Sequence, residues 1–137
     1  MSNRILFVDD ESNILDSFRR QLRGKFEIET ANSGQEALRE LAANPYAIIV
    51  ADMRMPGMDG LELLGTVHAA HPKVVRMMLT GNADRQTAVD AVNKGQVFQF
   101  LTKPCAPEEL TAALRAGLEL YYLEAQIDQI QSFLTAA

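Results

Sequence analysis

Three aspartates, a threonine and a lysine stand in this 137-residue sequence at or just beyond the ends of short apolar runs. Asp9 and Asp10 follow Ile5–Val8, Asp52 follows Ala47–Val50, Thr80 follows Val74–Leu79, and Lys103 follows Val97–Leu101. Three neighbouring carboxylates repel one another, and a hard divalent cation with oxygen ligands relieves that repulsion. Mg²⁺ suits such a site because it combines a few carboxylates with water and phosphate oxygens.

A metal-neutralised aspartate can attack a phosphoryl group, and the product is an acyl phosphate. The hydroxyl of Thr80 can hydrogen-bond one phosphoryl oxygen, and the ammonium of Lys103 can pair with another. The added charge and the new acceptor oxygens would pull on both side chains. The set of residues therefore predicts a phosphorylation switch.

The apolar runs suit strands that are buried on both faces, as in a parallel sheet. The segment 27–31 alternates instead and predicts an edge strand. Helical patterns fill the intervals: Ile14–Leu22 before Gly24, a Ser33–Glu36 capping box before Ala37–Leu41, Leu61–Val67, Ala88–Val92 before Gly95, and a helix from Pro107. Five β-α units with right-handed crossovers place helices on both faces of the sheet, and sites form at the carboxyl ends of its strands.

The last helix is longer than a single domain needs, since it runs from Pro107 to about Leu134, or roughly 40 Å. Beyond its core-facing first half, apolar residues recur in steps of three and four, which is a coiled-coil pattern. These residues are Leu120, Leu123, Ile127, Ile130 and Leu134. The pattern favours a homodimer formed through this helix.

The composition of the chain excludes several classes of protein. Apolar residues make up 47% of the chain, so a packed core is expected rather than disorder. The net charge of −5 with no basic cluster argues against direct nucleic-acid binding. No apolar run is long enough to cross a membrane, and the single cysteine, Cys105, excludes an intrachain disulfide and a cysteine-based zinc site. Without an export signal at its start, the chain is expected in the cytoplasm.

Four short motifs together resemble the receiver domain of two-component response regulators over about residues 4–120. They are Asp9-Asp10, Asp52-Met53-Arg54-Met55-Pro56-Gly57-Met58-Asp59-Gly60, Thr80-Gly81 and Lys103-Pro104. The resemblance implies a flavodoxin-like (βα)5 three-layer sandwich with strand order 2-1-3-4-5. It also implies a receiver over 1–120, with 121–137 as a helical extension or coiled-coil linker toward an output domain.

The resemblance also implies a role for each matching residue. Asp52 would accept a phosphoryl group from a histidine kinase or phosphotransfer protein. Asp10 would bind Mg²⁺ directly, Asp9 mostly through water, and Arg54 through its backbone carbonyl. Thr80 and Lys103 would relay the change to the aromatic switch Phe100, while Arg54 and Asn82 would tune hydrolysis. The Lys103–Pro104 peptide is often cis in such domains.

Other interpretations remain open at this stage. Asp9-Asp10 can simply cap a helix, Phe100 can be a core residue, and Cys105 is more readily an inert side chain than a redox sensor. Two other functions compete with the phosphorylation switch: a receiver-like interaction module that works without phosphate, and a phosphohydrolase with an aspartate nucleophile. Such a hydrolase needs a second aspartate two residues after its nucleophile, where this sequence has Arg54. A flavodoxin is less favoured because the acidic strand ends would repel the phosphate of FMN.

On the leading interpretation the chain is no enzyme beyond self-catalysed phosphotransfer and autodephosphorylation. The segment from Thr80 to Pro104 resembles receivers joined to cyclic-di-GMP phosphodiesterases or to hydrogenase-type transcription activators. The reading frame is therefore expected to continue past Ala137.

Overall fold

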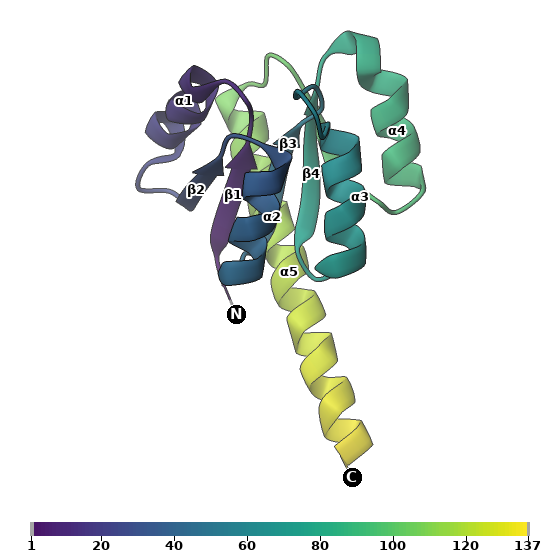
Figure 1. Ribbon diagram of the computed structural model, residues 1–137. Coiled ribbons are helices and arrows are strands. Elements are labelled where there is room, and N and C mark those ends of the chain that lie inside the picture. The colour runs from purple at the N-terminus through teal and green to yellow at the C-terminus, as the bar shows by residue number, and fades with distance from the viewer. Residues whose placement is uncertain (1, 137) are drawn as a thin grey trace.

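The computed structural model describes residues 2–136, and strands and helices alternate along it (Figure 1). The elements are β1 (Arg4–Val8), α1 (Ser12–Leu22), β2 (Glu27–Ala31), α2 (Gly34–Ala43), β3 (Ile48–Asp52), α3 (Gly60–Ala70), β4 (Val75–Thr80), the 3-10 turn η1 (Asn82–Asp84), α4 (Arg85–Asn93), β5 (Gln99–Thr102) and α5 (Pro107–Ala136). The five strands form one parallel sheet in the order β2-β1-β3-β4-β5. The predicted flavodoxin-like architecture is confirmed.

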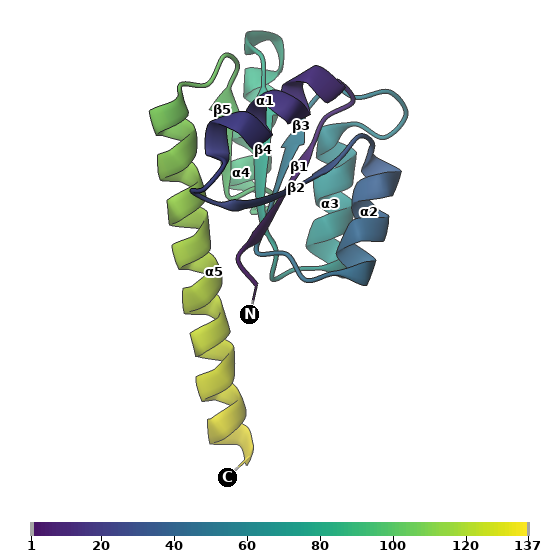
Figure 2. The same cartoon turned by 90° about the vertical axis from the view of Figure 1, so that its left-hand side faces the viewer.

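Two apolar cores cover the two faces of this sheet. Alternate side chains of the central strands point to opposite faces, so Leu6 and Ile49 pack toward α2, α3 and α4. Their neighbours Phe7 and Ile48 pack toward α1 and α5. Figure 2 shows α1 and α5 on one side of the sheet and α2 and α3 on the other. Because β1 and β3 are buried on both faces, their carboxyl ends are held firmly beside each other.

The fifth strand differs from the prediction at its start. The expected strand Val97–Leu101 begins only at Gln99, although Val97 is buried. The reason lies in Arg76 of β4, whose guanidinium Nε donates to the carbonyl of Gln96 at 2.8 Å, while the Phe98 amide donates to the Arg76 carbonyl at 2.7 Å. These bonds turn the chain between α4 and β5 before regular pairing begins.

Helix caps fix the loops at both edges of the sheet. The predicted Ser33 cap is present, and its hydroxyl oxygen accepts from the Glu36 amide at 3.1 Å. Asp59 caps α3 in the same way, through the Glu62 amide at 2.8 Å. Gly95 follows the end of α4 with a φ of +75°, the left-handed conformation that favours glycine.

Helix α5 has two parts with different surroundings. Its first half packs on the sheet through Leu110, Ala113, Leu114 and Gly117, and its second half projects beyond the body of the domain (Figure 1). Two contacts hold α5 to the domain where it begins to project: the Ser2 amide donates to Tyr121 Oη at 3.2 Å, and Lys73 forms an ion pair with Asp128. Within residues 2–136, no helix combines the length and the hydropathy that a membrane crossing needs.

The projecting part of α5 exposes most of the predicted apolar seam. Leu120 is half-buried against the domain's own core, whereas the other four members are more than half exposed. These four are Leu123, Ile127, Ile130 and Leu134. Phe133, which the pattern left out, is the most exposed large apolar side chain of the described residues, at 77%. The last residue of the expected linker 121–137 lies outside the described residues.

Candidate functional site

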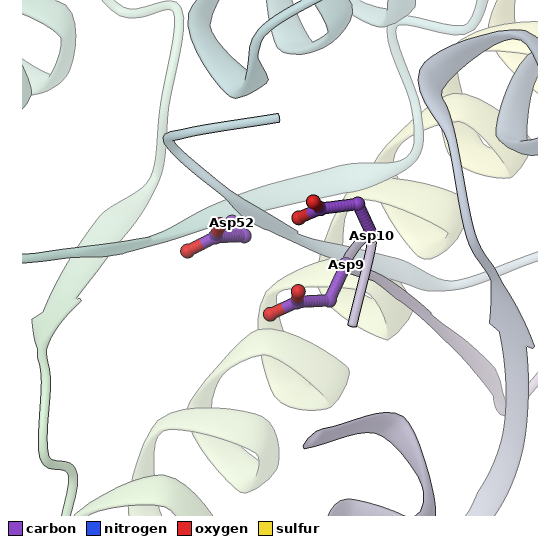
Figure 3. Close-up of side chains that lie close together, drawn as sticks. All are labelled: Asp9, Asp10 and Asp52. Carbon is purple, nitrogen blue, oxygen red and sulfur yellow. The ribbon is translucent and has the colours of Figure 1, made fainter. Parts of the chain in front are cut away.

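Three carboxylates meet at the carboxyl edge of the sheet. Asp52 is the last residue of β3, and Asp9 and Asp10 directly follow β1. Since Val8 pairs with Ala51, the next residue of each strand lies side by side. One carboxylate oxygen from each aspartate lies within 4.8 Å of the others. Figure 3 shows the three side chains gathered in one region at the ends of their strands. The predicted acid cluster is therefore formed.

Burial makes this cluster electrostatically unfavourable by itself. Asp9 is 2% exposed and Asp52 4%, whereas Asp10 lies at the surface. Loss of hydration raises the pKa of Asp9 above its ordinary value of 3.8, and the charges of Asp52 and Asp10 raise it further. A hydrogen bond from the Glu11 amide to Asp9 Oδ1, at 3.0 Å, and the charge of Lys103 act in the opposite direction.

The second oxygen of Asp9 tests whether a cation fits the site. Asp9 Oδ2 is buried and accepts no hydrogen bond, which is costly for a carboxylate. A hard cation between the three aspartates would give this oxygen a partner and would cancel the repulsion among them. The donor set consists of oxygens only, which Mg²⁺ prefers. The residues therefore fit the metal that the sequence implied.

Thr80, at the end of β4, and Lys103, directly after β5, approach the cluster from the other side of Asp52. Lys103 Nζ forms an ion pair with Asp52 Oδ1, and the Lys103 amide donates to the Thr80 carbonyl at 2.8 Å. The Lys103–Pro104 peptide is cis. The Thr80 side chain is fully buried, and its hydroxyl donates to the Gly81 carbonyl at 3.2 Å. An anion on Asp52 would thus meet a cation already in place and a hydroxyl close to the same edge.

Three further predicted residues lie around this centre. Phe100 in β5 is half-buried and packs against the core beneath α4, so packing and switching are both compatible with its position. Asn82 is exposed in η1. The side chain of Arg54 is also exposed, and its guanidinium hydrogen-bonds to a residue that the sequence analysis did not single out.

That residue is Asp84. Arg54 Nε donates to Asp84 Oδ2 and Arg54 Nη2 to Asp84 Oδ1, both at 2.7 Å, so the pair is bidentate. The hydrogen bond from Arg54 lowers the pKa of Asp84. In the sequence, Asp84 resembles any acid at a helix start, and only its position in the loop after Thr80 could have indicated a role beside the site.

Several sulfur-containing side chains lie near the site, and their surroundings indicate packing rather than chemistry. Met53, Met55, Met77 and Met78 are buried and fill the cores above and below the sheet. Burial raises the pKa of the Cys105 thiol, and the nearby charge of Glu109 raises it further. A raised thiol pKa disfavours the reactive thiolate, which supports an inert role for Cys105.

We predict that replacing Asp9 by Asn stabilises the metal-free protein, because the amide oxygen can still accept from Glu11 while the buried charge is lost. A carboxyl with a raised pKa binds its proton more readily in the folded state, so its ionisation costs stability above that pKa and costs nothing below 3.8. The melting temperature at pH 7 should rise by on the order of 3 °C.

The stabilisation by Asp9→Asn should shrink as the pH falls through the raised pKa of Asp9, which thermal melts followed by circular dichroism will show. Added Mg²⁺ should raise the melting temperature of the wild type much more than that of the variant. A wild type more stable than Asp9→Asn without metal would contradict the unfavourable charge assigned to Asp9.

Comparison with known proteins identifies the family to which this sequence is similar. The sequence profile of the response regulator receiver domain matches residues 5–115. Among curated proteins, the chain is 32% identical over 126 residues to the hydrogenase transcriptional regulatory protein HoxA of Cupriavidus necator, with 92% of this chain and 26% of HoxA covered. The chain thus spans about a quarter of the length of the curated relatives it matches.

Solved structures give the same result. A crystal structure described as adenylate cyclase from Rhodopirellula baltica has a TM-score of 0.92 and 42% identity, covering 96% of this chain and 98% of that one. The signal receiver domain of an HD domain-containing protein from Pseudomonas fluorescens has a TM-score of 0.82 and 31% identity, covering 89% and 98%. With its fold, its acid cluster and its sequence all in agreement, this chain belongs to the response regulator receiver domain family.

Proposed function

We propose that this receiver accepts a phosphoryl group on Asp52 from the phosphohistidine of a sensor histidine kinase or a phosphotransfer protein. The observation that supports this most directly is the position of Asp52, buried at the sheet edge beside two other aspartates and in contact with Lys103. The carboxylate is the nucleophile, and the surrounding charges compensate the charge that arrives with the phosphoryl group.

The transfer exchanges one bond to phosphorus for another. A carboxylate oxygen of Asp52 bonds to phosphorus while the bond from phosphorus to the donor's imidazole nitrogen breaks. The nitrogen keeps the electron pair. Lys103, already paired with Asp52, would then pair with a phosphoryl oxygen, and the Thr80 hydroxyl would donate to another.

Asp10, Asp9, Asp52 and the backbone carbonyl of Arg54 would hold Mg²⁺, with Asp9 acting mostly through water. When bound, the ion neutralises the carboxylates and the incoming phosphoryl oxygens. The buried oxygen Asp9 Oδ2 accepts no hydrogen bond in the structure, and this supports a role for Asp9 in holding the ion.

The switch would start at Thr80 and Lys103. If the Thr80 hydroxyl leaves the Gly81 carbonyl for a phosphoryl oxygen, the end of β4 moves toward Asp52. Phe100, which packs only partly into the core, would then turn into the space that is vacated. Arg54 and Asn82, on the loops after β3 and β4, would tune the later hydrolysis of the acyl phosphate.

Acetyl phosphate provides the direct test, because it replaces the kinase with a small donor. After incubation of the protein with acetyl phosphate and Mg²⁺, intact-mass spectrometry should show one added phosphoryl group. Chelation of the metal with EDTA should reduce the adduct to the level of a sample without donor. A protein that gains no phosphoryl group from acetyl phosphate in the presence of Mg²⁺, and that also fails to bind beryllofluoride as a phosphoryl analogue, would sink the proposal.

We further propose that residues 1–120 form the receiver and that the helix beyond it links two copies to an output domain. The relatives include a transcriptional regulator, an HD domain-containing protein and a protein described as an adenylate cyclase, so a transcription activator or a cyclic-di-GMP phosphodiesterase remains the proposed kind of output. A kinase-dependent switch of this kind would act in the cytoplasm, without binding nucleic acid through the receiver itself.

The seam of Leu123, Ile127, Ile130 and Leu134 predicts the dimer contact. Replacing Ile127 by Lys should weaken dimerisation at least about 10-fold, because a charge would enter the apolar seam of both copies. Gln129→Lys on the same helix, but off the seam, is the matched control for charge. Sedimentation equilibrium measures both, and equal dissociation constants for the two variants would argue against this seam.

A further inference from the structure

The ion pair between Arg54 and Asp84 crosses the same edge of the sheet that holds Asp52. Arg54 lies two residues after Asp52 on the loop that leaves β3, and Asp84 lies four residues after Thr80 on the loop that leaves β4. The strands are neighbours, with Asp52 paired to Leu79. Both side chains, together with Met53 and Asp59, line one hollow beside the site. The pair thus joins the two loops that would flank a phosphoryl group.

The geometry of the pair is more specific than an ordinary surface contact. Two parallel hydrogen bonds of 2.7 Å fix the plane of the Arg54 guanidinium. The side chain of Asp84 is only 12% exposed, while that of Arg54 is 76% exposed. Exposed ion pairs contribute little to stability because water screens them, so stability alone does not account for this arrangement.

The side chain of Asp84 does not cap the helix that follows it. It precedes α4 directly, at the place where an aspartate commonly caps a helix, yet its side chain caps no amide of α4. Its two oxygens accept from Arg54 instead. The carboxylate is therefore committed to the guanidinium.

A phosphoryl group on Asp52 would compete for that guanidinium. It presents several anionic oxygens, and arginine binds phosphate oxygens with the same paired donors that it offers to a carboxylate. In the structure the guanidinium pairs with Asp84, whereas Asp52 pairs with Lys103. Asp84 and the phosphoryl group are thus alternative partners for one arginine.

We propose that Asp84 is a positioning residue that restrains Arg54 and thereby shortens the lifetime of the phosphorylated receiver. The inference rests on the proposed phosphorylation of Asp52. In hydrolysis a water oxygen bonds to phosphorus, the bond from phosphorus to Asp52 breaks, and the carboxylate keeps the electron pair while the proton of water passes to solvent. A guanidinium released from Asp84 would bind the phosphoryl oxygens and cover the approach of that water.

The test is a double-mutant cycle on the rate of dephosphorylation. Each protein is phosphorylated with acetyl phosphate, freed of donor on a desalting column and followed by intact mass in the presence of Mg²⁺. The Asp84→Asn variant should keep its phosphoryl group about 3- to 10-fold longer than the wild type, a scale typical of one charge-assisted contact. In an Arg54→Gln background, the same Asp84→Asn change should have no effect on the lifetime.

Two controls separate positioning from general effects. Asp90→Asn removes an exposed acid of α4 and changes the net charge equally, so it should leave the lifetime unchanged. Arg54→Lys keeps the charge without the paired donors and should reduce the effect of Asp84→Asn. An Asp84→Asn lifetime that is unchanged, shorter, or lengthened equally in both backgrounds overturns the inference. A wild type that never gains the phosphoryl group overturns the proposed function, and this inference with it.

Discussion

Replacing Asp52 by Asn will abolish phosphorylation by acetyl phosphate, with a loss of at least about 100-fold in the rate of adduct formation. The amide has nearly the shape of the carboxylate but lacks its negative charge, so it is a poor nucleophile toward phosphorus and a weak partner for Lys103. Intact-mass spectrometry after a time course with donor and Mg²⁺ gives the rate directly.

The matched control for this variant is Asp16→Asn, which makes the same chemical change at an exposed position of α1. It should be phosphorylated at the rate of the wild type. Circular dichroism should show that both variants are folded, so that lost reactivity is not mistaken for lost structure. An adduct that persists in Asp52→Asn would place the acceptor elsewhere and would favour a receiver-like module that works without phosphate on Asp52.

The second large effect is expected at Gly60, the first residue of α3. A Cβ added there would lie 2.2 Å from the carbonyl oxygen of Asp52 and 2.9 Å from Cα of Met53, and both are backbone atoms that cannot rotate away. The Gly60 amide also donates to the Met53 carbonyl at 2.9 Å, which ties the two segments together. Gly60→Ala should therefore cost about 3 kcal/mol in the free energy of unfolding.

Gly65→Ala is the natural comparison, because the same helix carries it and its added Cβ would meet nothing within 4 Å. Alanine favours a helix over glycine, so this variant should gain about 0.5–1 kcal/mol. Urea unfolding followed by far-ultraviolet circular dichroism measures both, since the chain has no tryptophan. Equal stabilities for the two variants would show that the junction of β3 and α3 is looser than described.

The acid cluster could be predicted because it depends on few steps. A continuously apolar strand ends where its polar residues begin, and a parallel sheet brings all carboxyl ends to one edge. Asp9, Asp10 and Asp52 therefore had to lie close together once the strands were recognised. The order of the strands is different, since periodicity says nothing about it, and the order 2-1-3-4-5 followed only from the resemblance to receivers.

Contacts between side chains of different loops could not be predicted from the sequence. Arg54 and Asp84 are thirty residues apart, and neither belongs to a repeating pattern that would indicate its partner. The start of β5 at Gln99 is a similar case, because the hydrogen bond from the Arg76 side chain to the Gln96 carbonyl just before it is a contact that no apolar pattern indicates. Long polar side chains reach over several residues, so their partners depend on the folded geometry.

Helix α5 begins beside the cis peptide at Lys103–Pro104 and leaves the domain at the opposite edge of the sheet (Figure 2). One continuous helix therefore connects the edge that holds the acid cluster with the far end of the described residues. Residues 121–136 span about 24 Å, so a tilt of about 10° at their base would displace the far tip by about 4 Å. On the proposed switch, a small rearrangement at the acid cluster that tilts the base of α5 would therefore be amplified along the projecting helix.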